Sequence, residues 1–303
     1  MSENKLISII TPSYNRAEMI GTAIESVLSQ NYPNFEHIII DANSTDNTID
    51  VLAQYPHVKV IREPDSGMYD ALNKGLKAAI GDYIGFLNTD DHYAPDIFNL
   101  IAEQFENAAT DAVVGQAEIF RKDHIGKHVV IRQISPALPE NLLGQVIFRV
   151  PIFNAWFFRR SIFEENGGFD TNYRIAGDRE LLLRYIIADF SYRRINKVVY
   201  YYQQHANALT TTGGDSNYMS YAPEHLKLTK DYLDSRQTPG KIKPYLQKLR
   251  TRDTLNLSIY YLKIFRLGRA GYFAYQGIKY DKRWPLFFLS RVLRINGKSR
   301  ELL

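Results

Sequence analysis

Segments of two kinds alternate along the first 90 residues of the chain. Short apolar runs rich in β-branched residues, typical of buried strands, occupy residues 6–11, 35–41, 58–61 and 83–87. Between these runs, apolar residues recur three and four positions apart, which is the spacing of one helix face. Strand and helix alternate at roughly 25–30 residues per unit, which is typical of βαβ units on a parallel sheet. The pattern therefore predicts an α/β fold with a mostly parallel central sheet flanked by helices. Further along the chain, we expect residues 111–120 and 129–133 to pair as antiparallel strands and residues 191–205 to form two strands.

Polar residues gather where three of these strands end. The sequence TPSYN occupies residues 11–15, DANS occupies residues 41–44, and NTDD occupies residues 88–91. Because open α/β sheets bind ligands at the carboxyl ends of their parallel strands, we expect the three segments to form one site. Asp90 and Asp91, with hydroxyls and amides around them, suit Mg²⁺ or Mn²⁺ held together with substrate phosphates. Adjacent acids are also typical of a turn or a helix cap.

Several other ways of binding phosphate are missing from the sequence. Neither G-x-G-x-x-G nor G-x-x-x-x-G-K-[ST] occurs, which argues against a dinucleotide dehydrogenase and a P-loop enzyme. The chain has no cysteine, so disulfides, thiolate metal sites and a cysteine nucleophile are excluded. We therefore expect a phosphate-bearing ligand to be held through a metal ion.

Three stretches resemble the family 2 glycosyltransferases in their order and spacing. They are ISIITPSYNRAEMIGTAIESVLSQNYPNFEHIIIDANSTDNT, EPDSGMYDALNKGLKAAIGDYIGFLNTDD and NAWFFRRSIFEENGGFDTNYRIAGDRELLLR, and together they extend over roughly residues 5–216. The resemblance implies a GT-A fold, a nucleoside-diphosphate sugar donor, a divalent metal ion and inversion at the anomeric carbon.

The resemblance also implies roles for single residues. In the D-x-D-type motif the first acid is replaced by Asn88, whose amide can still bond a ribose hydroxyl. Asp41 would accept a hydrogen bond from the base and so favour a UDP-sugar. The residues expected to bind the donor are Thr11, Pro12, Tyr14, Asp41, Asp65 and Asn88. The expected metal ligands are Asp90, Asp91 and His205.

The third stretch carries the expected catalytic base. Asp178, within AGDRE, matches the position of that base in the family, and Glu180 is the second candidate. A general base that deprotonates the attacking hydroxyl contributes ~10²–10⁴-fold to the rate. Both acids are also typical of the first turn of a helix, where the helix dipole favours negative charge. Trp156 and Phe157 either stack on an acceptor sugar or pack in the core.

The sign of the charge changes along the chain. Residues 217–303 hold 18 Lys and Arg against 6 Asp and Glu, whereas residues 1–216 hold 19 against 27. These counts give a net charge of +12 for residues 217–303 and −8 for residues 1–216. We therefore predict a GT-A catalytic domain over residues 1–216 and a basic, aromatic helical extension over residues 217–303, which face different partners.

Within the extension, one predicted helix face carries large apolar side chains among cations. Its members are Trp284, Phe288, Val292 and Ile295. Such a face suits either packing on the catalytic domain or attachment to an anionic membrane surface. No nucleic-acid-binding module is visible, so nucleic acid is not an expected partner. A polar start and the lack of a run of ~20 apolar residues predict a cytoplasmic protein, peripheral on the inner face of the plasma membrane.

The leading hypothesis is a metal-dependent, inverting glycosyltransferase. It would move a sugar from a UDP-sugar to a hydroxyl of a glycan or lipid-linked acceptor in the assembly of bacterial surface polysaccharide or lipopolysaccharide. One alternative is a non-catalytic nucleotide- or glycan-binding relative, which Asn88 keeps open. A second is a sugar-nucleotide pyrophosphorylase, whose G-x-G-T-R signature is absent. The absence of Q-x-x-R-W argues against a processive synthase.

Overall fold

The structure is a computed structural model that describes residues 5–106, 109–149, 152–205 and 215–294. The chain divides into two compact units. Unit 1 comprises Met1–Gln145 and Val150–Ala208, and unit 2 comprises Val146–Arg149 and Leu209–Leu303. The domain boundary expected after residue 216 stays a prediction.

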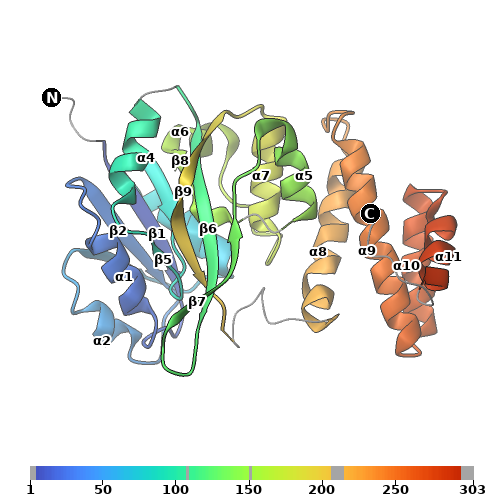
Figure 1. Cartoon of the computed structure of the whole chain (residues 1–303), viewed down its shortest axis with the longest axis horizontal. Helices are drawn as coiled ribbons and strands as arrows, with labels where there is room; N and C mark the ends of the chain where they lie inside the picture. Colours follow the sequence, from blue (N-terminus) through green and yellow to red (C-terminus); the bar gives the residue numbers. More distant parts are fainter. Residues whose placement is uncertain (1–4, 107–108, 150–151, 206–214, 295–303) are drawn as a thin grey trace. The chain divides into compact units, whose positions relative to one another are not determined.

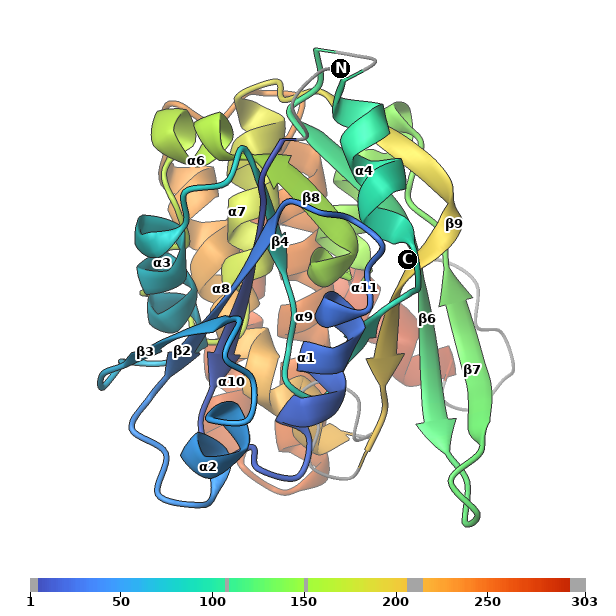
Figure 2. The same ribbon diagram turned by 90° about the vertical axis from the view of Figure 1, so that its left-hand side faces the viewer.

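Within the described residues, unit 1 contains a nine-stranded mixed sheet (Figure 2). Its strands are β1 (Ile7–Ser13), β2 (Phe35–Asp41), β3 (Val58–Arg62), β4 (Tyr83–Phe86), β5 (His92–Tyr93), β6 (Ala112–Lys122), β7 (His128–Ile134), β8 (Trp156–Arg159) and β9 (Tyr192–Gln203). The strand order is β3-β2-β1-β4-β8-β6-β9-β5, and β7 pairs antiparallel with residues 117–122 of β6, beyond the residues that pair with β8. The first four strands are mutually parallel, whereas β8 runs antiparallel between β4 and β6.

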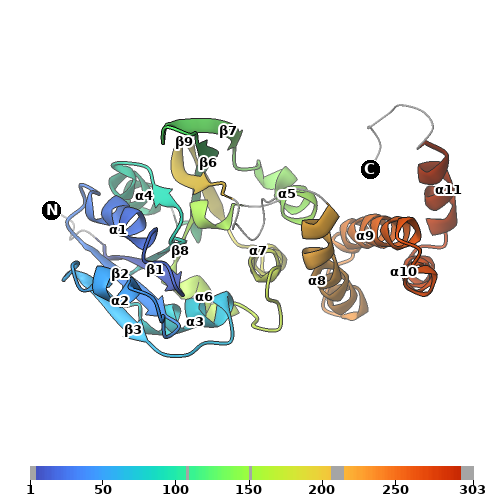
Figure 3. The same ribbon diagram turned by 90° about the horizontal axis from the view of Figure 1, so that it is seen from below.

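Helices cover both faces of this sheet. They are α1 (Ile20–Leu28), α2 (Thr48–Leu52), α3 (Met68–Ala78), α4 (Ile97–Glu106), α6 (Arg160–Asn166) and α7 (Gly177–Ile187), with short 3₁₀ turns η1 (Pro139–Asn141) and η2 (Phe153–Ala155). Figure 3 shows α1 and α4 on one side of the parallel strands and α3 and α6 on the other. The helix α3 lies so close to β1 that a Cβ on Gly75 would come within 2.2 Å of the Ile10 side chain. A residue without a side chain is therefore needed at this contact.

Most of the strands expected from the sequence are present. The four parallel strands and the antiparallel pair β6–β7 are confirmed. The prediction of two strands over residues 191–205 is wrong, because one continuous strand, β9, runs through this segment. The register between β6 and β9 shifts near Gln116 instead of breaking at a turn.

The helix α5 (Leu142–Phe148) contributes its last residues to unit 2, which otherwise contains α8 (Asp215–Asp234), α9 (Lys243–Lys263), α10 (Leu267–Tyr280) and α11 (Trp284–Arg294) (Figure 1). Within this unit α9 packs between α8 and α10. Trp284 is buried, and its indole Nε1 donates a hydrogen bond to Thr254 Oγ1 over 2.9 Å. The ring of Phe288 stacks on Trp284 at 5.2 Å between centroids.

The expected apolar face of α11 is thus divided. Trp284 packs inside unit 2, Val292 is exposed, and Ile295 lies outside the described residues. Leu286 and Leu289 also face solvent. Among the helices of the described segments, none has the length and hydropathy needed to span a bilayer.

Candidate active site

Hydrogen bonds join the loops that follow β1 and β2. Asn15 N donates to Ser44 Oγ, and Thr45 N donates to Asn15 Oδ1, each over 2.8 Å. Asn15 and Asn43 have φ values of 53° and 58°, a left-handed conformation that asparagine adopts more readily than most residues. The expected convergence of these two strand ends is confirmed.

Asp41 is the last residue of β2, and its carboxylate is fully buried. Its Oδ2 accepts a hydrogen bond from Ser44 N over 2.9 Å, and its Oδ1 accepts one from Ser44 Oγ over 2.5 Å. Arg62 Nε lies 3.6 Å from Oδ2. Asp41 therefore fixes the loop after β2, and its expected contact with a donor base stays a prediction.

The other expected donor-binding residues differ in accessibility. Thr11 is buried, and its hydroxyl lies 2.9 Å from Nε2 of His37 on β2. Pro12 is partly exposed and the ring of Tyr14 is 55% exposed. Asp65 Oδ1 accepts a hydrogen bond from Gly67 N over 2.9 Å at the entry to α3. Pro12 and Tyr14 thus present surface to a ligand, whereas Thr11 and Asp65 support the local fold.

Asp90 and His205 form a close pair. Asp90 follows β4, His205 follows β9, and the distance from His205 Nε2 to Asp90 Oδ2 is 2.8 Å. Both side chains keep about a fifth of their surface exposed, 19% for His205 and 23% for Asp90. The structure therefore brings together two of the three expected metal ligands in a place that a ligand can reach.

Asp91 is held from several sides in the interior. Tyr200 OH donates to its Oδ2 over 2.6 Å, and Asn88 Nδ2 donates to the same oxygen over 3.1 Å. The backbone N–H of Gln203 donates to Oδ1 over 2.8 Å. Tyr200 OH in turn accepts a hydrogen bond from Asn154 Nδ2 over 2.8 Å. Asp91 thus ties the loop after β4 to β9 and to the turn η2.

The protonation of Asp91 follows from this environment. Burial and the neighbouring charge of Asp90 raise the pKa of Asp91 to about 8, although the bonds from Tyr200, Gln203 and Asn88 favour the charged form. Its side chain is only 1% exposed. We therefore interpret Asp91 as a residue that positions the loop, and Asp90 as the acid available to a ligand.

The donor set at this place suits a divalent cation that is shared with a substrate. Within the described segments no cluster of three or more His, Asp or Glu side chains has the geometry of a metal site. Asp90 and His205 supply one carboxylate and one imidazole. A cation held next to phosphates usually takes one or two protein carboxylates and completes its shell with phosphate oxygens and water. The residues present therefore fit such an ion when a diphosphate accompanies it.

Asp178 lies at the start of α7, beside α3. Its backbone N–H donates to Tyr69 OH over 3.2 Å, and Tyr69 OH donates to Ile175 O over 2.9 Å. Asp178 Oδ1 accepts a hydrogen bond from Arg179 N over 2.6 Å, and the side chain stays partly exposed. Burial raises the pKa of the Asp178 carboxyl against the opposing charge of Arg179. A carboxyl with a raised pKa is well suited to take up a proton.

Glu180 has a different environment. Its two carboxylate oxygens accept hydrogen bonds from Arg184 Nε over 3.0 Å and from a terminal guanidinium nitrogen of Arg184 over 2.8 Å. The same guanidinium donates to Gly168 O over 2.7 Å. Glu180 is 5% exposed. Its contacts connect α7 to the segment after α6, which favours Asp178 as the base.

Sequence reasoning missed the residues that hold Asp91. Tyr200, Gln203 and Asn154 carry no motif, and Tyr200 is separated from Asp91 by 109 positions. A polar residue inside an otherwise aromatic segment, Asn154 in FNAWFF, was the available signal. Trp156 and Phe157 are buried in the core, so the packing interpretation holds for both in this structure.

Comparisons with known proteins agree with this site. The sequence profile of "Glycosyl transferase family 2" matches residues 8–167. An uncharacterized glycosyltransferase of Mycobacterium tuberculosis is 32% identical over 189 residues, which are 61% of this chain and 70% of that protein. The putative teichuronic acid biosynthesis glycosyltransferase TuaG of Bacillus subtilis is 44% identical over 96 residues, or 30% of this chain and 38% of TuaG.

Solved structures support the fold. Residues 1–349 of S. aureus TarS, in complex with UDP-GlcNAc, give a TM-score of 0.62 at 13% identity, covering 93% of this chain and 92% of that one. The mannosyltransferase PcManGT of Pyrobaculum calidifontis, in complex with GDP-Man and Mn²⁺, gives 0.60 at 18% identity, covering 97% and 81%. The expected GT-A fold is thereby confirmed.

These findings exclude one of the alternatives that the sequence left open. The profile match covers more than half of the chain and includes both strand ends of the site and the NTDD segment. The chain is a glycosyltransferase and not a pyrophosphorylase. It belongs to glycosyltransferase family 2.

Proposed function

We propose that this enzyme transfers a sugar, with inversion, from a nucleoside-diphosphate donor to a hydroxyl of a polysaccharide or lipid-linked acceptor. The observation that carries the proposal is the pair of Asp90 and His205, partly exposed at the end of the sheet where the loops after β1 and β2 meet. Family membership supplies the reaction class, and the pair supplies a place for a metal-bound diphosphate.

Donor binding would begin at the loops after β1 and β2. The exposed ring of Tyr14 offers a stacking surface for a base, and Asp41 holds the neighbouring loop rigid. Among the relatives in solved complexes, TarS binds UDP-GlcNAc and PcManGT binds GDP-Man. We favour a UDP-sugar here, because the resemblance to the family assigns Asp41 to the N–H of the donor base.

Asp90 and His205 would hold the cation, and Asp91 would keep their loop in place. When bound, the cation supplies a Lewis acid that neutralises charge on the leaving diphosphate. The imidazole favours Mn²⁺ over Mg²⁺, because nitrogen ligands suit transition metals better. Asp178 would accept the proton of the attacking acceptor hydroxyl, for which its raised pKa is suited.

The acceptor and the location form the second part of the proposal. TuaG is named for teichuronic acid biosynthesis, which suggests a surface polysaccharide as the product class. The net charge of +12 over residues 217–303 suits attachment to the anionic inner face of the plasma membrane, where lipid-linked acceptors lie.

A donor-hydrolysis experiment tests the reaction. The purified chain is incubated with UDP- and GDP-sugars, and release of nucleoside diphosphate is measured with Mn²⁺ and with chelator. We expect metal-dependent release from one nucleotide class in the wild type and none in Asp90→Ala. Donor binding without any release, with or without acceptor glycans, would identify a non-catalytic member of the family.

A further inference from the structure

The turn between α9 and α10 exposes apolar and basic side chains in alternation. Every residue from Leu262 to Arg269, in the sequence LKIFRLGR, is exposed. Phe265 is 88% exposed and Leu267 is 66% exposed. The eight residues include three cations and no acid. A soluble surface rarely presents apolar groups so fully in such a short segment unless they bind something.

The backbone of this turn forms a Schellman motif. Arg266 N donates to Tyr261 O over 2.8 Å, and Phe265 N donates to Leu262 O over 3.1 Å. Phe265 therefore occupies the position after the helix where glycine is usual, and its φ is +56°. A bulky residue is strained in this left-handed region. Because the ring is almost fully exposed, the fold gains little packing from it, and the strain indicates a role outside the chain.

Further exposed rings follow along α10. Tyr272 and Tyr275 are 58% and 64% exposed, and Ile278 is 42% exposed. Their spacing of three residues places them along one stripe of the helix. Tyrosine is enriched at membrane–water interfaces, where the ring meets apolar chains and the hydroxyl meets headgroups. The stripe therefore has the composition of an interfacial helix.

We propose that the α9–α10 turn is the membrane-docking element, with Phe265 and Leu267 inserted at the boundary between headgroups and acyl chains. Lys263, Arg266 and Arg269 would lie among anionic headgroups. The charge favours an anionic membrane over a second copy of the chain, because in a symmetric dimer these cations would lie opposite identical cations and repel them. The inference rests on the proposed attachment to the membrane and names the surface responsible for it.

Vesicle co-sedimentation of the full chain tests the proposal. The wild type should pellet with phosphatidylcholine vesicles that contain phosphatidylglycerol, less with pure phosphatidylcholine, and less at high salt. Phe265→Gly should lower the affinity for anionic vesicles about tenfold or more, because the variant has no ring to transfer from water into the membrane. The same change should keep or raise the melting temperature, because glycine is favoured at this backbone position.

A matched control separates this surface from exposed apolar area in general. Ile80 in unit 1 is 69% exposed, so Ile80→Ala removes a similarly accessible apolar group. We expect Ile80→Ala to pellet like the wild type. The proposal would be overturned if Phe265→Gly bound anionic vesicles as tightly as the wild type. It would also be overturned if Phe265→Gly and Ile80→Ala lost the same vesicle affinity.

A spectroscopic variant reports insertion directly. Both native tryptophans, Trp156 and Trp284, are buried, so an indole introduced by Phe265→Trp is the one that meets lipid. Its fluorescence should shift to the blue with anionic vesicles and should be quenched by brominated acyl chains. If vesicles pellet the protein but leave the emission spectrum unchanged, another part of the chain contacts the membrane and the proposal for this turn is rejected.

Two further readouts keep the outcomes distinct. Size-exclusion chromatography with light scattering detects self-association. If the wild type is a dimer and Phe265→Gly is a monomer, the turn is a dimer contact and the membrane proposal is overturned. Donor hydrolysis depends on unit 1 and should be equal in Phe265→Gly and wild type. A chain that hydrolyses donor but ignores vesicles contradicts this inference and the proposed membrane attachment and leaves the proposed reaction standing. A chain that binds vesicles without hydrolysis contradicts only the proposed reaction.

Discussion

His205 Nε2 lies 2.8 Å from Asp90 Oδ2, although 115 positions separate the two residues in the sequence. The first residue follows β9 and the second follows β4, so the fold of unit 1 itself creates the pair. A carboxylate and a neutral imidazole both offer lone pairs to a cation, so the pair can serve as two of its ligands.

The first prediction concerns this pair. Asp90→Ala and His205→Ala should each remove the strengthening of UDP binding by Mn²⁺, while UDP binding in the presence of chelator stays at the wild-type level. Transfer by Asp90→Ala should fall by about two orders of magnitude or more, because the charge of the leaving diphosphate is no longer neutralised. Isothermal titration with and without Mn²⁺ measures the first effect.

A distant acid provides the control for that experiment. Glu103 is an exposed residue of α4, and Glu103→Ala should leave metal-dependent UDP binding unchanged. If Asp90→Ala binds UDP with the full Mn²⁺ enhancement, the cation is held by other residues, and Asp91 becomes the acid to test.

The second prediction uses two neighbouring tyrosines as a matched pair. Tyr200→Phe removes the hydroxyl that connects Asn154 to Asp91 and leaves the buried Asp91 and the partly buried Asn154 without that partner. The free energy of unfolding should fall by about 1–3 kcal/mol. Tyr201→Phe removes a hydroxyl from the next, partly exposed residue, and it should change stability by less than about 0.5 kcal/mol. Urea unfolding of both variants gives the comparison.

The same cluster has a dependence on pH. Because the pKa of Asp91 is raised to about 8, the folded state holds its proton more tightly than the unfolded state does. The contribution of Asp91 to stability is therefore greatest below the ordinary pKa near 4, and it declines as pH rises towards 8. Asp91→Asn should remove this decline. A stability curve of the same slope in both proteins would show that Asp91 titrates normally.

Much of unit 1 was predictable because its signals are local. Alternating strand and helix periods depend on neighbouring residues, and they located β1, β2, β3 and β4 and the loops that follow β1, β2 and β4. The connection between Asp91 and Tyr200 depends on how β9 lies in the sheet, which no local pattern contains. For the same reason the segment 191–205 was divided into two strands, although pairing with β6 keeps it as one.

The apolar face of α11 shows a second limit of prediction from sequence. Periodicity identifies which residues share a side of a helix, but a buried side and a membrane-facing side have the same spacing. The structure places Trp284 against α9 through its bond to Thr254 and leaves Phe265, in a turn without periodicity, exposed. That turn differs from an ordinary helix end because a bulky, exposed residue has the positive φ, a conformation that the sequence does not reveal.

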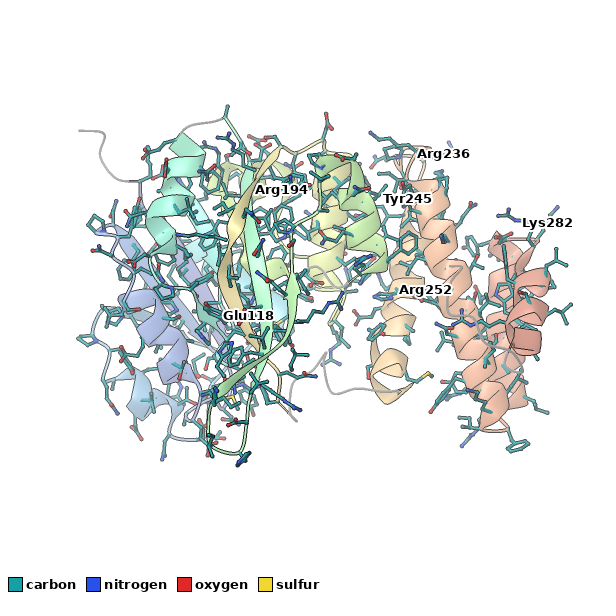
Figure 4. All side chains as sticks on the ribbon, viewed as in Figure 1. Glu118, Arg194, Arg236, Tyr245, Arg252 and Lys282 are labelled. Atoms are coloured by element: carbon teal, nitrogen blue, oxygen red, sulfur yellow. The ribbon has the colours of Figure 1, made fainter. Side chains whose placement is uncertain are left out.

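The third prediction concerns acid stability in unit 2, whose helix α9 carries Arg252 (Figure 4). Asp253 is fully buried between His225 Nδ1 at 3.0 Å and Arg252 Nε at 2.8 Å. Burial alone would raise the pKa of Asp253, but the hydrogen bond and charge of His225 and the charge of Arg252 outweigh it and lower the pKa. A lowered folded pKa stabilises the protein above the ordinary value near 4, and this contribution is lost as pH falls below it.

Two aspartates in unit 2 allow a controlled test. Asp253→Asn should cost about 3–5 kcal/mol at neutral pH, because the partners of a buried ion pair are left uncompensated, and it should flatten the loss of stability below pH 4. Asp231 forms an exposed pair with Lys227, so Asp231→Asn should cost under about 1 kcal/mol. Thermal unfolding followed by circular dichroism between neutral and acidic pH measures both. Equal, small effects would show that the Asp253 pair adds nothing to stability.

The last prediction concerns the base. Asp178→Asn preserves the shape of the side chain but cannot accept a proton, so transfer should fall by about 10²–10⁴-fold while the affinity for UDP and the melting temperature stay near the wild-type values. In the wild type, the raised pKa of Asp178 means that the rate should increase with pH over a range above the ordinary value for an aspartate, because only the ionised carboxylate takes up the proton. This rise should be absent from the residual rate of Asp178→Asn. Glu180→Gln supplies the contrast: it weakens the bidentate contact with Arg184 and should lower the melting temperature, with the pH profile of the rate retained. Wild-type turnover in a stably folded Asp178→Asn would leave Asp178 as an acid of the first helical turn and transfer the role of base to another residue.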